Sequence, residues 1–335
     1  MSSQSFKPLR LGTRGSLLAR TQSGTFAATV ADLLGFPVEE AVQEVIIRTE
    51  GDDSTKPLNE SKTPGLFVNA LRDALVRGEV DFIVHSFKDL PTGSVDGIAL
   101  VAVPEREDLS DVLVSNGNLK LSELPVGAVL GTSSPRRSAK LQFVRPDLVV
   151  RPIRGNIDTR IAKVRSGEYD ATVLAAAGLK RIGRLEEAAE HLGLDVLLPA
   201  PAQGALAVEC RSDDEHTRAI LSQLDNPEVR VITAAERAIL VGVGATCSTA
   251  VGAVAEIIDG VELLIRAELS HPTPSETGIE YERFEISAVL SEGLATPAAL
   301  SEAHQLGLYA AARLLETPLG HRVLAEISAE RAGLD

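Results

Sequence analysis

Short apolar runs alternate with amphipathic stretches along most of the chain. The segment Val42 to Arg48 is typical of a strand. The segment Leu66 to Arg77 repeats its apolar residues with the helical period and ends before Gly78, which predicts a helix. Asp81 to His85 then predicts a short buried strand. This alternation of strands and helices predicts an α/β protein with largely parallel sheets.

The same alternation continues through the middle of the chain. The strands predicted there are Ala128 to Gly131, Val149 to Ile153 and Ala171 to Ala175, and the helices are Ser134 to Phe143 and Asp158 to Arg165. Because a helix separates each strand from the next, we expect these strands to lie parallel in one sheet.

Two proline-containing segments, Val103 to Asp108 and Leu198 to Gln203, interrupt this alternation and are typical of hinges. After the second one, Gly204 to Cys210 predicts a strand that returns to the first sheet. The chain would then form two lobes joined by two crossings, a layout suited to closing over a ligand. The boundaries we expect are residues 1–104 with 204–224 for domain 1, residues 105–203 for domain 2 and residues 225–335 for domain 3.

The pattern changes after Asn226 and predicts a smaller α+β domain toward the C-terminus. Thr233 to Glu236 matches a capping box and predicts the start of a helix, and Leu300 to Leu315 predicts a terminal helix. Gly51 to Gly65 is polar and rich in turn-forming residues, so we expect a mobile, functional loop there.

The net charge of −14 is unevenly distributed along the chain. Residues 131–165 hold nine basic and two acidic side chains. A basic segment in an acidic protein is typical of a pocket for a polyanionic ligand, with a solvated basic face as the alternative. The overall acidity and the aromatic content of only 3% disfavour nucleic acid and anionic membranes as partners.

The two cysteines, Cys210 and Cys247, make a disulfide framework unlikely to be the basis of the fold. The six histidines show no metal-ligand spacing, so no metal is expected. No apolar run approaches the roughly 18 residues of a membrane span. The polar start, Met1 to Arg10, has no secretory h-region. We therefore expect a cytoplasmic protein.

Leu11 to Arg20 (LGTRGSLLAR) predicts a strand that ends at Gly12 and a helix that begins near Ser16. Backbone N–H groups at that helix start favour an anion, and Arg14 would add positive charge. An ordinary strand-to-helix turn, with Ser16 as its N-cap, explains the same residues.

His85 to Pro91 (HSFKDLP) follows the predicted buried strand. Lys88 and Asp89 are therefore expected at its carboxyl end, where ligands bind in open α/β sheets. A Lys–Asp surface pair that precedes a turn is the alternative.

Arginines recur where strands give way to helices in the basic segment, in Gly131 to Arg137 (GTSSPRR) and Arg151 to Arg160 (RPIRGNIDTR). The carboxyl ends of parallel strands meet at one edge of a sheet, so we expect these side chains to converge. The planar guanidinium grips carboxylates through two hydrogen bonds. Because few acids lie nearby in the sequence, a polycarboxylate ligand is favoured over scattered salt bridges.

Cys247 lies just past a predicted helix, in the small-residue segment Gly242 to Ser248. That placement suits a nucleophilic or attachment thiol, with a buried structural cysteine as the alternative. Cys210 lies inside an apolar strand and is expected to be part of the core.

Taken together, these segments resemble the porphobilinogen deaminase (hydroxymethylbilane synthase) family from about Leu9 to Gly252. The similarity is strongest in GTRGS, HSFKDLP, GTSSPRR, RPIRGNIDTR, LAAAGLKR and PAPAQGALAVEC, and it is their order and spacing that make it specific. The resemblance implies a monomer with an α/β fold: two lobes like those of periplasmic binding proteins, joined by hinge crossings, plus a smaller α+β C-terminal domain.

The resemblance also implies a transferase. Four porphobilinogen units would condense onto a dipyrromethane cofactor, each with loss of ammonia, before water releases hydroxymethylbilane for tetrapyrrole and haem biosynthesis. Cys247 matches the cysteine that carries the cofactor through a thioether, and Asp89 and Lys88 match the catalytic positions. The implied cofactor-binding residues are Lys88, Ser134, Arg136, Arg137, Arg160 and Arg181, and the substrate-binding residues are Arg14, Ser16, Arg154 and Arg181.

Two segments depart from the family pattern. The family commonly has a Gly-Cys pair followed shortly by proline, whereas here Thr246 precedes Cys247 and Ser-Thr-Ala-Val follows it. The loop before Gly65 often ends in lysine, whereas here Pro64 stands at that place and Lys62 is the nearest cation. The alternative function is that of a two-lobed receptor for a small anion, although such receptors are usually secreted and do not need a thiol of this kind.

Overall fold

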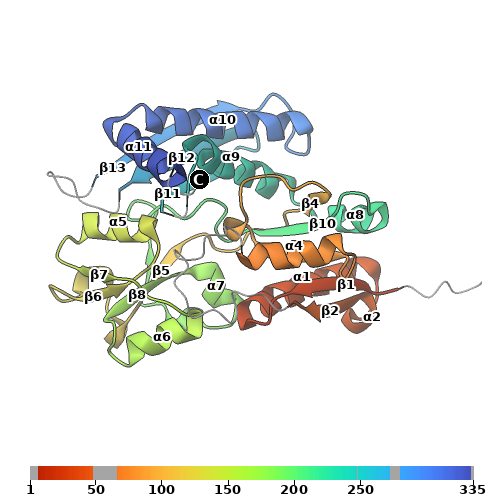
Figure 1. The fold of residues 1–335 in the computed structure, drawn as a ribbon, viewed down its shortest axis with the longest axis horizontal. Helices are drawn as coiled ribbons and strands as arrows, with labels where there is room; N and C mark the ends of the chain where they lie inside the picture. The colour runs from red at the N-terminus through yellow and green to blue at the C-terminus, as the bar shows by residue number, and fades with distance from the viewer. Residues whose placement is uncertain (1–6, 48–65, 247, 272–279, 333–335) are drawn as a thin grey trace, which may run out of the picture. The chain divides into compact units, whose positions relative to one another are not determined.

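The computed structural model describes residues 7–47, 66–246, 248–271 and 280–332 (Figure 1). The chain forms two compact units: residues 1–106 with 205–230 make up unit 1, and residues 107–204 with 231–335 make up unit 2. The chain therefore leaves unit 1 within the first predicted hinge and returns to it just after the second. The loop predicted at Gly51 to Gly65 lies outside the described residues. The division into three domains remains a prediction.

Unit 1 is built on a five-stranded sheet in the order β2-β1-β3-β10-β4. The strands are β1 Leu9–Thr13, β2 Val42–Ile46, β3 Phe82–Ser86, β4 Ile98–Ala102 and β10 Leu206–Arg211. The helices are α1 Leu17–Leu34, α2 Val38–Ala41, α4 Leu66–Val76 and α8 Glu215–Leu221. The core between α1 and the sheet includes Phe26, Phe82 and Cys210. The core position predicted for Cys210 is therefore confirmed, and burial raises the pKa of its thiol to about 11.

Unit 2 contains a second five-stranded sheet in the order β7-β6-β8-β5-β9. The strands are β5 Asp111–Ser115, β6 Val129–Gly131, β7 Val149–Arg151, β8 Ala171–Ala175 and β9 Glu190–Leu192. The helices are α5 Pro135–Val144, α6 Ile157–Arg165 and α7 Ala176–Arg181. These bounds agree to within two residues with every strand and helix predicted for this part of the chain.

Each five-stranded sheet has one strand that runs against the other four. Strand β10 is antiparallel to both β3 and β4, and β5 is antiparallel to both β8 and β9. Both β10 and β5 enter their sheets directly after a crossing from the other unit, so no crossover helix obliges them to run parallel to their neighbours. The prediction of largely parallel sheets is confirmed, as is the return of the segment after the second hinge to the first sheet.

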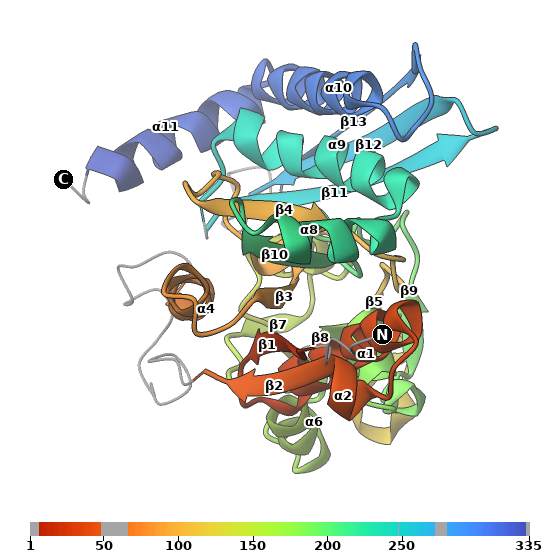
Figure 2. The same cartoon turned by 90° about the vertical axis from the view of Figure 1, so that its right-hand side faces the viewer.

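The rest of unit 2 is a three-stranded antiparallel sheet covered by long helices (Figure 2). The strands are β11 Ala250–Ile258, β12 Glu262–Ser270 and β13 Tyr281–Val289, and the helices are α9 Pro227–Val243, α10 Pro297–Leu315 and α11 Pro318–Ala332. Helix α10 contacts β12 and β13, and α5 contacts β11 and β12. The apolar faces of these elements form one core that includes Ile239, Leu263 and Leu314.

The capping box predicted at Thr233 to Glu236 is wrong, because both residues lie inside α9. Glu236 is completely buried and accepts hydrogen bonds from two distant backbone N–H groups, Ala202 at 2.6 Å and Ala255 at 2.9 Å. A buried carboxylate must be paired with donors. The acid at this place therefore joins the second hinge segment to β11 instead of starting a helix.

Candidate functional site

The turn after β1 carries the first predicted binding residues, Arg14 and Ser16. Ser16 is the N-cap of α1, and its hydroxyl accepts a hydrogen bond from the backbone N–H of Ala19 at 3.4 Å. The N-cap explanation of Ser16 is therefore confirmed. Arg14 lies between the strand and the helix and is half-buried. Because β1 and β3 are parallel neighbours, this turn and the segment after β3 lie at the same edge of the sheet.

Asp89 closes a short 3-10 turn, Phe87–Asp89, directly after β3. Phe87 and Leu90 are buried on either side, and the backbone N–H of Phe87 donates to the carbonyl of Ala205 at 3.0 Å. With both neighbours anchored in the core, Asp89 is exposed and Lys88 is half-buried. The turn thus presents an acid and a base at the carboxyl end of a buried strand, as predicted.

A buried ion network links α4, β10 and β3, the strand that precedes this turn. Arg72 on α4 binds Glu209 on β10 through two hydrogen bonds of 2.9 and 2.5 Å, and His85 lies 3.4 Å from the same carboxylate. Burial alone would raise the pKa of Glu209, but the hydrogen bonds from Arg72 and the nearby imidazole of His85 lower it to about 2. His85 belongs to β3 and lies four residues before Asp89, so this network fixes the strand that carries the turn.

In unit 2, Arg136 and Arg137 begin α5 and are buried. Both guanidiniums bind Asp111, the completely buried first residue of β5, at 2.7 and 2.6 Å. Arg136 also donates to the carbonyl of Leu198 at 2.5 Å and Arg137 to that of Val173 at 2.9 Å. Burial disfavours the charge on Asp111, but the two arginines outweigh it and lower the pKa of the carboxyl far below its usual range.

Arg160 and Arg181 lie in a different electrostatic setting. Arg160 is half-buried on α6, and no ion pair to it is found within the described residues; its Nε donates to the carbonyl of Gly155 at 2.9 Å. Burial, and then the neighbouring charges of Arg137 and Arg154, lower the pKa of Arg160. Arg181 on α7 donates to the carbonyl of Gly204 at 2.7 Å, and burial lowers its pKa despite the charge of Glu107. Positive charge at these places would be stabilised by an anionic ligand.

The turn that leads to Arg160 has its own local order. Gly155 has φ +109°, a conformation that other residues rarely adopt, and a Cβ there would lie 2.5 Å from Thr159. Asn156 caps α6 by accepting from the N–H of Thr159 at 2.9 Å. In the same way Ser134 caps α5 by accepting from the N–H of Arg137 at 3.4 Å. The strand-to-helix junctions predicted to carry the arginines therefore exist.

The expectation that few acids pair with the basic segment is wrong, because the acids come from other parts of the chain. Asp111 binds Arg136 and Arg137, Glu268 lies 3.1 Å from Lys140, and Glu187 lies 2.6 Å from Arg165. Asp111 and Glu268 are buried. Some cations of the basic segment are therefore held in buried ion pairs, and others form ion pairs at the surface. Around Arg160 the segment instead holds arginines that repel one another.

Cys247 lies outside the described residues. The residues around it belong to unit 2, and β11 begins three residues later. Helix α5 packs on β11: a Cβ on Gly252 would lie 3.0 Å from Leu198 and 3.5 Å from the side chain of Arg136. The strand that follows Cys247 therefore lies against the helix that carries Arg136 and Arg137.

Sequence reasoning missed Asp111, Glu209 and Gln203. Gln203 donates to Asp111 at 3.1 Å, so the second hinge segment is part of the same network. The missed signal is a single acid within an apolar strand, as in DVLVS and LAVECR. Such an acid is costly to bury unless a cation accompanies it. It therefore predicts an arginine partner elsewhere in the chain.

The described parts of the chain contain neither a metal-binding cluster nor a helix that could span a membrane. No group of three or more His, Cys, Asp or Glu within residues 7–47, 66–246, 248–271 and 280–332 is arranged to hold a metal ion. Among the helices described there, none has the length and apolar character needed to cross a bilayer.

Two helix-flanked α/β sheets with arginines at strand ends are typical of proteins that bind an anionic ligand. The family model for the "Porphobilinogen deaminase, dipyromethane cofactor binding domain" matches residues 9–219. Porphobilinogen deaminase 1 of Streptomyces coelicolor is 52% identical over 256 residues, which cover 75% of this chain and 79% of that protein. The porphobilinogen deaminase of Mycobacterium tuberculosis is 49% identical over 254 residues, covering 76% of this chain and 80% of that protein. The chain belongs to the porphobilinogen deaminase family.

One solved structure with weak similarity is that of a solute binding protein. An ancestral cationic amino acid solute binding protein shares 15% identity and a TM-score of 0.38, over 65% of this chain and 87% of that one. This similarity is too low to support a conclusion, and the fold class rests on the sheets described above.

Proposed function

We propose that this chain is a transferase, hydroxymethylbilane synthase, that joins four porphobilinogen units on a dipyrromethane cofactor and then releases hydroxymethylbilane by hydrolysis. The observation that carries the proposal is the match of the family model over residues 9–219 together with about half-identical relatives of the same name. The activity belongs to tetrapyrrole synthesis. We further propose a monomer in the cytosol, which gel filtration and cell fractionation would test.

The residues of unit 2 fit a dipyrromethane group, because each pyrrole of that group carries an acetate and a propionate. Arg160 is half-buried near Arg137 and Arg154, and an anion there would relieve both the burial cost and the mutual repulsion. We propose that Cys247 carries the group through a thioether. The residues proposed to hold it are Lys88, Ser134, Arg136, Arg137, Arg160 and Arg181.

Arg136 and Arg137 already bind Asp111, and this shapes their proposed role. One buried acid facing two arginines leaves a net positive charge. The shared carboxylate also holds both guanidiniums in one orientation. Their remaining donors would therefore meet a carboxylate without a large loss of side-chain entropy. Ser134 caps the same helix, so the backbone donors at this helix start would favour the anion as well.

In unit 1, we propose that Asp89 performs the chemistry. Loss of ammonia leaves positive charge on the substrate ring, and an ionised carboxylate beside the pyrrole N–H would stabilise that charge and accept or return a proton. When bound, the cofactor supplies the pyrrole carbon that attacks the next unit. Lys88, one residue away, would hold a carboxylate of the ligand. Arg14, Ser16, Arg154 and Arg181 would bind the acetate and propionate groups of the incoming substrate.

The experiment that tests this function is an intact mass of the purified chain with peptide mapping. We expect an excess mass of two pyrrole units on the peptide that contains Cys247, either as purified or after incubation with porphobilinogen. Cys247→Ala should not acquire that mass, whereas Cys210→Ala should. A wild-type chain that carries no excess mass as purified and gains none from porphobilinogen would contradict the proposal, and we would then test binding of small anions. An adduct retained by Cys247→Ala would place the attachment elsewhere.

A further inference from the structure

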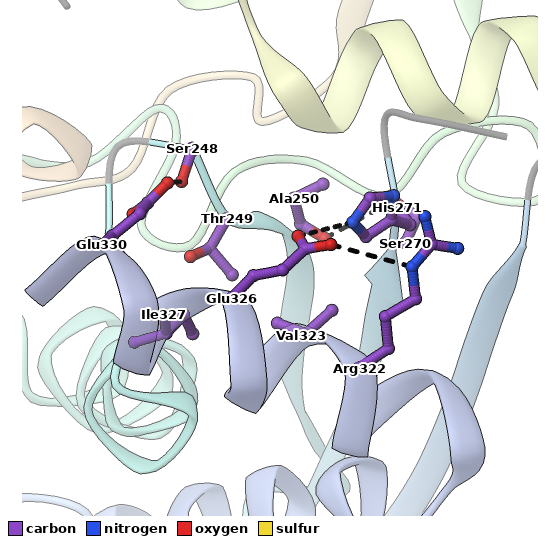
Figure 3. A pocket seen from close by; sticks show the side chains of 10 residues that line it. All are labelled: Ser248, Thr249, Ala250, Ser270, His271, Arg322, Val323, Glu326, Ile327 and Glu330. Carbon is purple, nitrogen blue, oxygen red and sulfur yellow. Dashed lines mark hydrogen bonds and ion pairs between the residues drawn. The ribbon is translucent and has the colours of Figure 1, made fainter. Parts of the chain in front are cut away.

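The residues on either side of Cys247 share one carboxylate. The hydroxyl of Thr246 donates to Oε2 of Glu330 at 2.8 Å, and the hydroxyl of Ser248 donates to Oε1 of the same residue at 2.5 Å. Figure 3 shows Glu330 reaching from α11 to Ser248. The two hydroxyls also lie 2.7 Å apart. A single acid near the end of the chain thus contacts both neighbours of the proposed attachment residue.

Helix α11, which carries Glu330, is packed into the core of unit 2. Val323 and Ile327 are buried in the core shared with β12 and α10, so the helix is anchored within one turn of Glu330. One turn earlier on the same side, Glu326 lies 2.7 Å from Nε2 of the buried His271, at the end of β12 (Figure 3). Residues four apart lie on the same face of a helix. Glu326 and Glu330 therefore tie one face of α11 to the domain at two successive turns.

Thr246 also closes a local turn. Its backbone N–H donates to the hydroxyl of Thr249 at 2.9 Å, and its carbonyl accepts from the N–H of Thr249 at 3.2 Å. Thr246 stands where the family pattern commonly has glycine, which has no hydroxyl. The hydrogen bond to Glu330 therefore depends on Thr246, the residue at which this chain departs from the family pattern.

We propose that Glu330 is a positioning residue for cofactor attachment: by holding Thr246 and Ser248, it restricts the backbone on both sides of the proposed attachment residue. The inference rests on the proposed function, since it assumes that Cys247 is the attachment residue. A restricted thiol reacts faster because less conformational freedom is lost on the way to the reactive geometry.

The test follows the gain of two pyrrole units by the full chain, freed of cofactor, during incubation with porphobilinogen, using intact mass against time. Glu330→Ala should slow the gain on the order of tenfold, the effect of losing a hydrogen-bonded charged acceptor. Glu330→Gln keeps an acceptor, and Thr246→Ser keeps the hydroxyl, so both should retain most of the rate. Thr246→Val should be slow like Glu330→Ala.

A matched control is Glu302→Ala. Glu302 accepts from both the backbone N–H and the hydroxyl of Ser291 in the same unit. Its replacement should leave the rate unchanged. Urea unfolding reports any loss of stability in the unit that contains α11, and if Glu330→Ala lowers that stability, Thr246→Val and Thr246→Ser decide the question without changing α11.

The outcomes separate the two claims. If the wild-type chain gains mass at Cys247 and both Glu330→Ala and Thr246→Val gain it at the same rate, the positioning role is wrong and the proposed function stands. If the wild-type chain gains no mass at Cys247, the proposed function fails and the positioning role fails with it.

Discussion

Asp89 and Asp111 are the same residue type in opposite surroundings. Asp89 ends a short turn after β3 in unit 1 and is exposed, because the buried Phe87 and Leu90 anchor the turn on both sides. Asp111 begins β5 in unit 2, is completely buried and binds two arginines. An acid next to cations is available for chemistry where the backbone holds it outward. Where the backbone buries it, the same pair of charges becomes framework.

The largest effect is expected from Asp89→Asn. The amide keeps the size of the side chain but can neither stabilise a cation as a carboxylate does nor accept a proton, so turnover should fall by about 10²- to 10⁴-fold. Because Asp89 is exposed, the free energy of unfolding and the bound cofactor should be unchanged. Steady-state kinetics, urea unfolding and intact mass of the same preparation check this. Normal turnover would remove Asp89 from its proposed role.

Asp111→Asn should lower the stability of the fold, whereas Asp89→Asn should lower turnover. Removing the shared acid leaves Arg136 and Arg137 buried without an anion, which costs about 3–5 kcal/mol of folding free energy. Urea unfolding measures the loss. The matched control is Asp147→Asn, since the pair of Asp147 with Arg145 is only half-buried and its loss should change stability less. A variant with wild-type stability would mean that the arginines do not depend on Asp111.

Arg160→Leu tests the arginine whose charged neighbours are other arginines. Burial and neighbouring cations already disfavour the charge of Arg160, so stability should be unchanged or slightly higher. Cofactor gain and turnover should fall by about 10- to 100-fold, the effect of losing a charge-assisted hydrogen bond to a carboxylate. Arg165→Leu on the same helix is the control, because Arg165 pairs with Glu187 at the surface. Equal kinetics for both variants would argue against a ligand at Arg160.

The smallest effect is a change in the pH dependence of stability. The pKa of Glu209 is lowered to about 2 in the folded protein, so its contribution is complete above the ordinary pKa and is lost as the pH falls toward 2. Between about pH 5 and pH 3 this loss amounts to roughly 1–2 kcal/mol. Glu209→Gln should flatten the pH profile of urea unfolding in that range. An unaltered slope would contradict the low pKa.

Much of the local structure could be predicted from the sequence. Periodicity located β2, β3, β6, β7, β8 and β10 and the helices α4, α5 and α6, because burial on one face imposes a period that survives in a single sequence. It did not locate β4, β5 or β9. Cap residues such as Ser16 and Ser134 marked helix starts for an equally local reason. The capping box at Thr233 failed because the same residues also fit a helix interior, and only the packing of α9 distinguishes the two cases.

The candidate site was predictable as a set of residue types at strand ends, since parallel strands bring their carboxyl ends to one edge of a sheet. The sequence did not predict which arginines pair with a buried acid. Asp111 lies 25 and 26 residues from Arg136 and Arg137, and Glu209 lies 137 residues from Arg72. Pairing over such separations depends on the order of strands in the sheet, which periodicity does not encode.

By itself, the sequence determined the alternation of strands and helices, the positions of the hinge segments and the family, because each depends on residue order and local propensity. Only the tertiary structure decided that Asp111 binds Arg136 and Arg137 while Arg160 has other arginines as its charged neighbours, and that Glu330 binds the residues beside Cys247. The physical reason is that the energy of a charge depends on burial and on the nearest opposite charge, and both are set by residues far away along the chain.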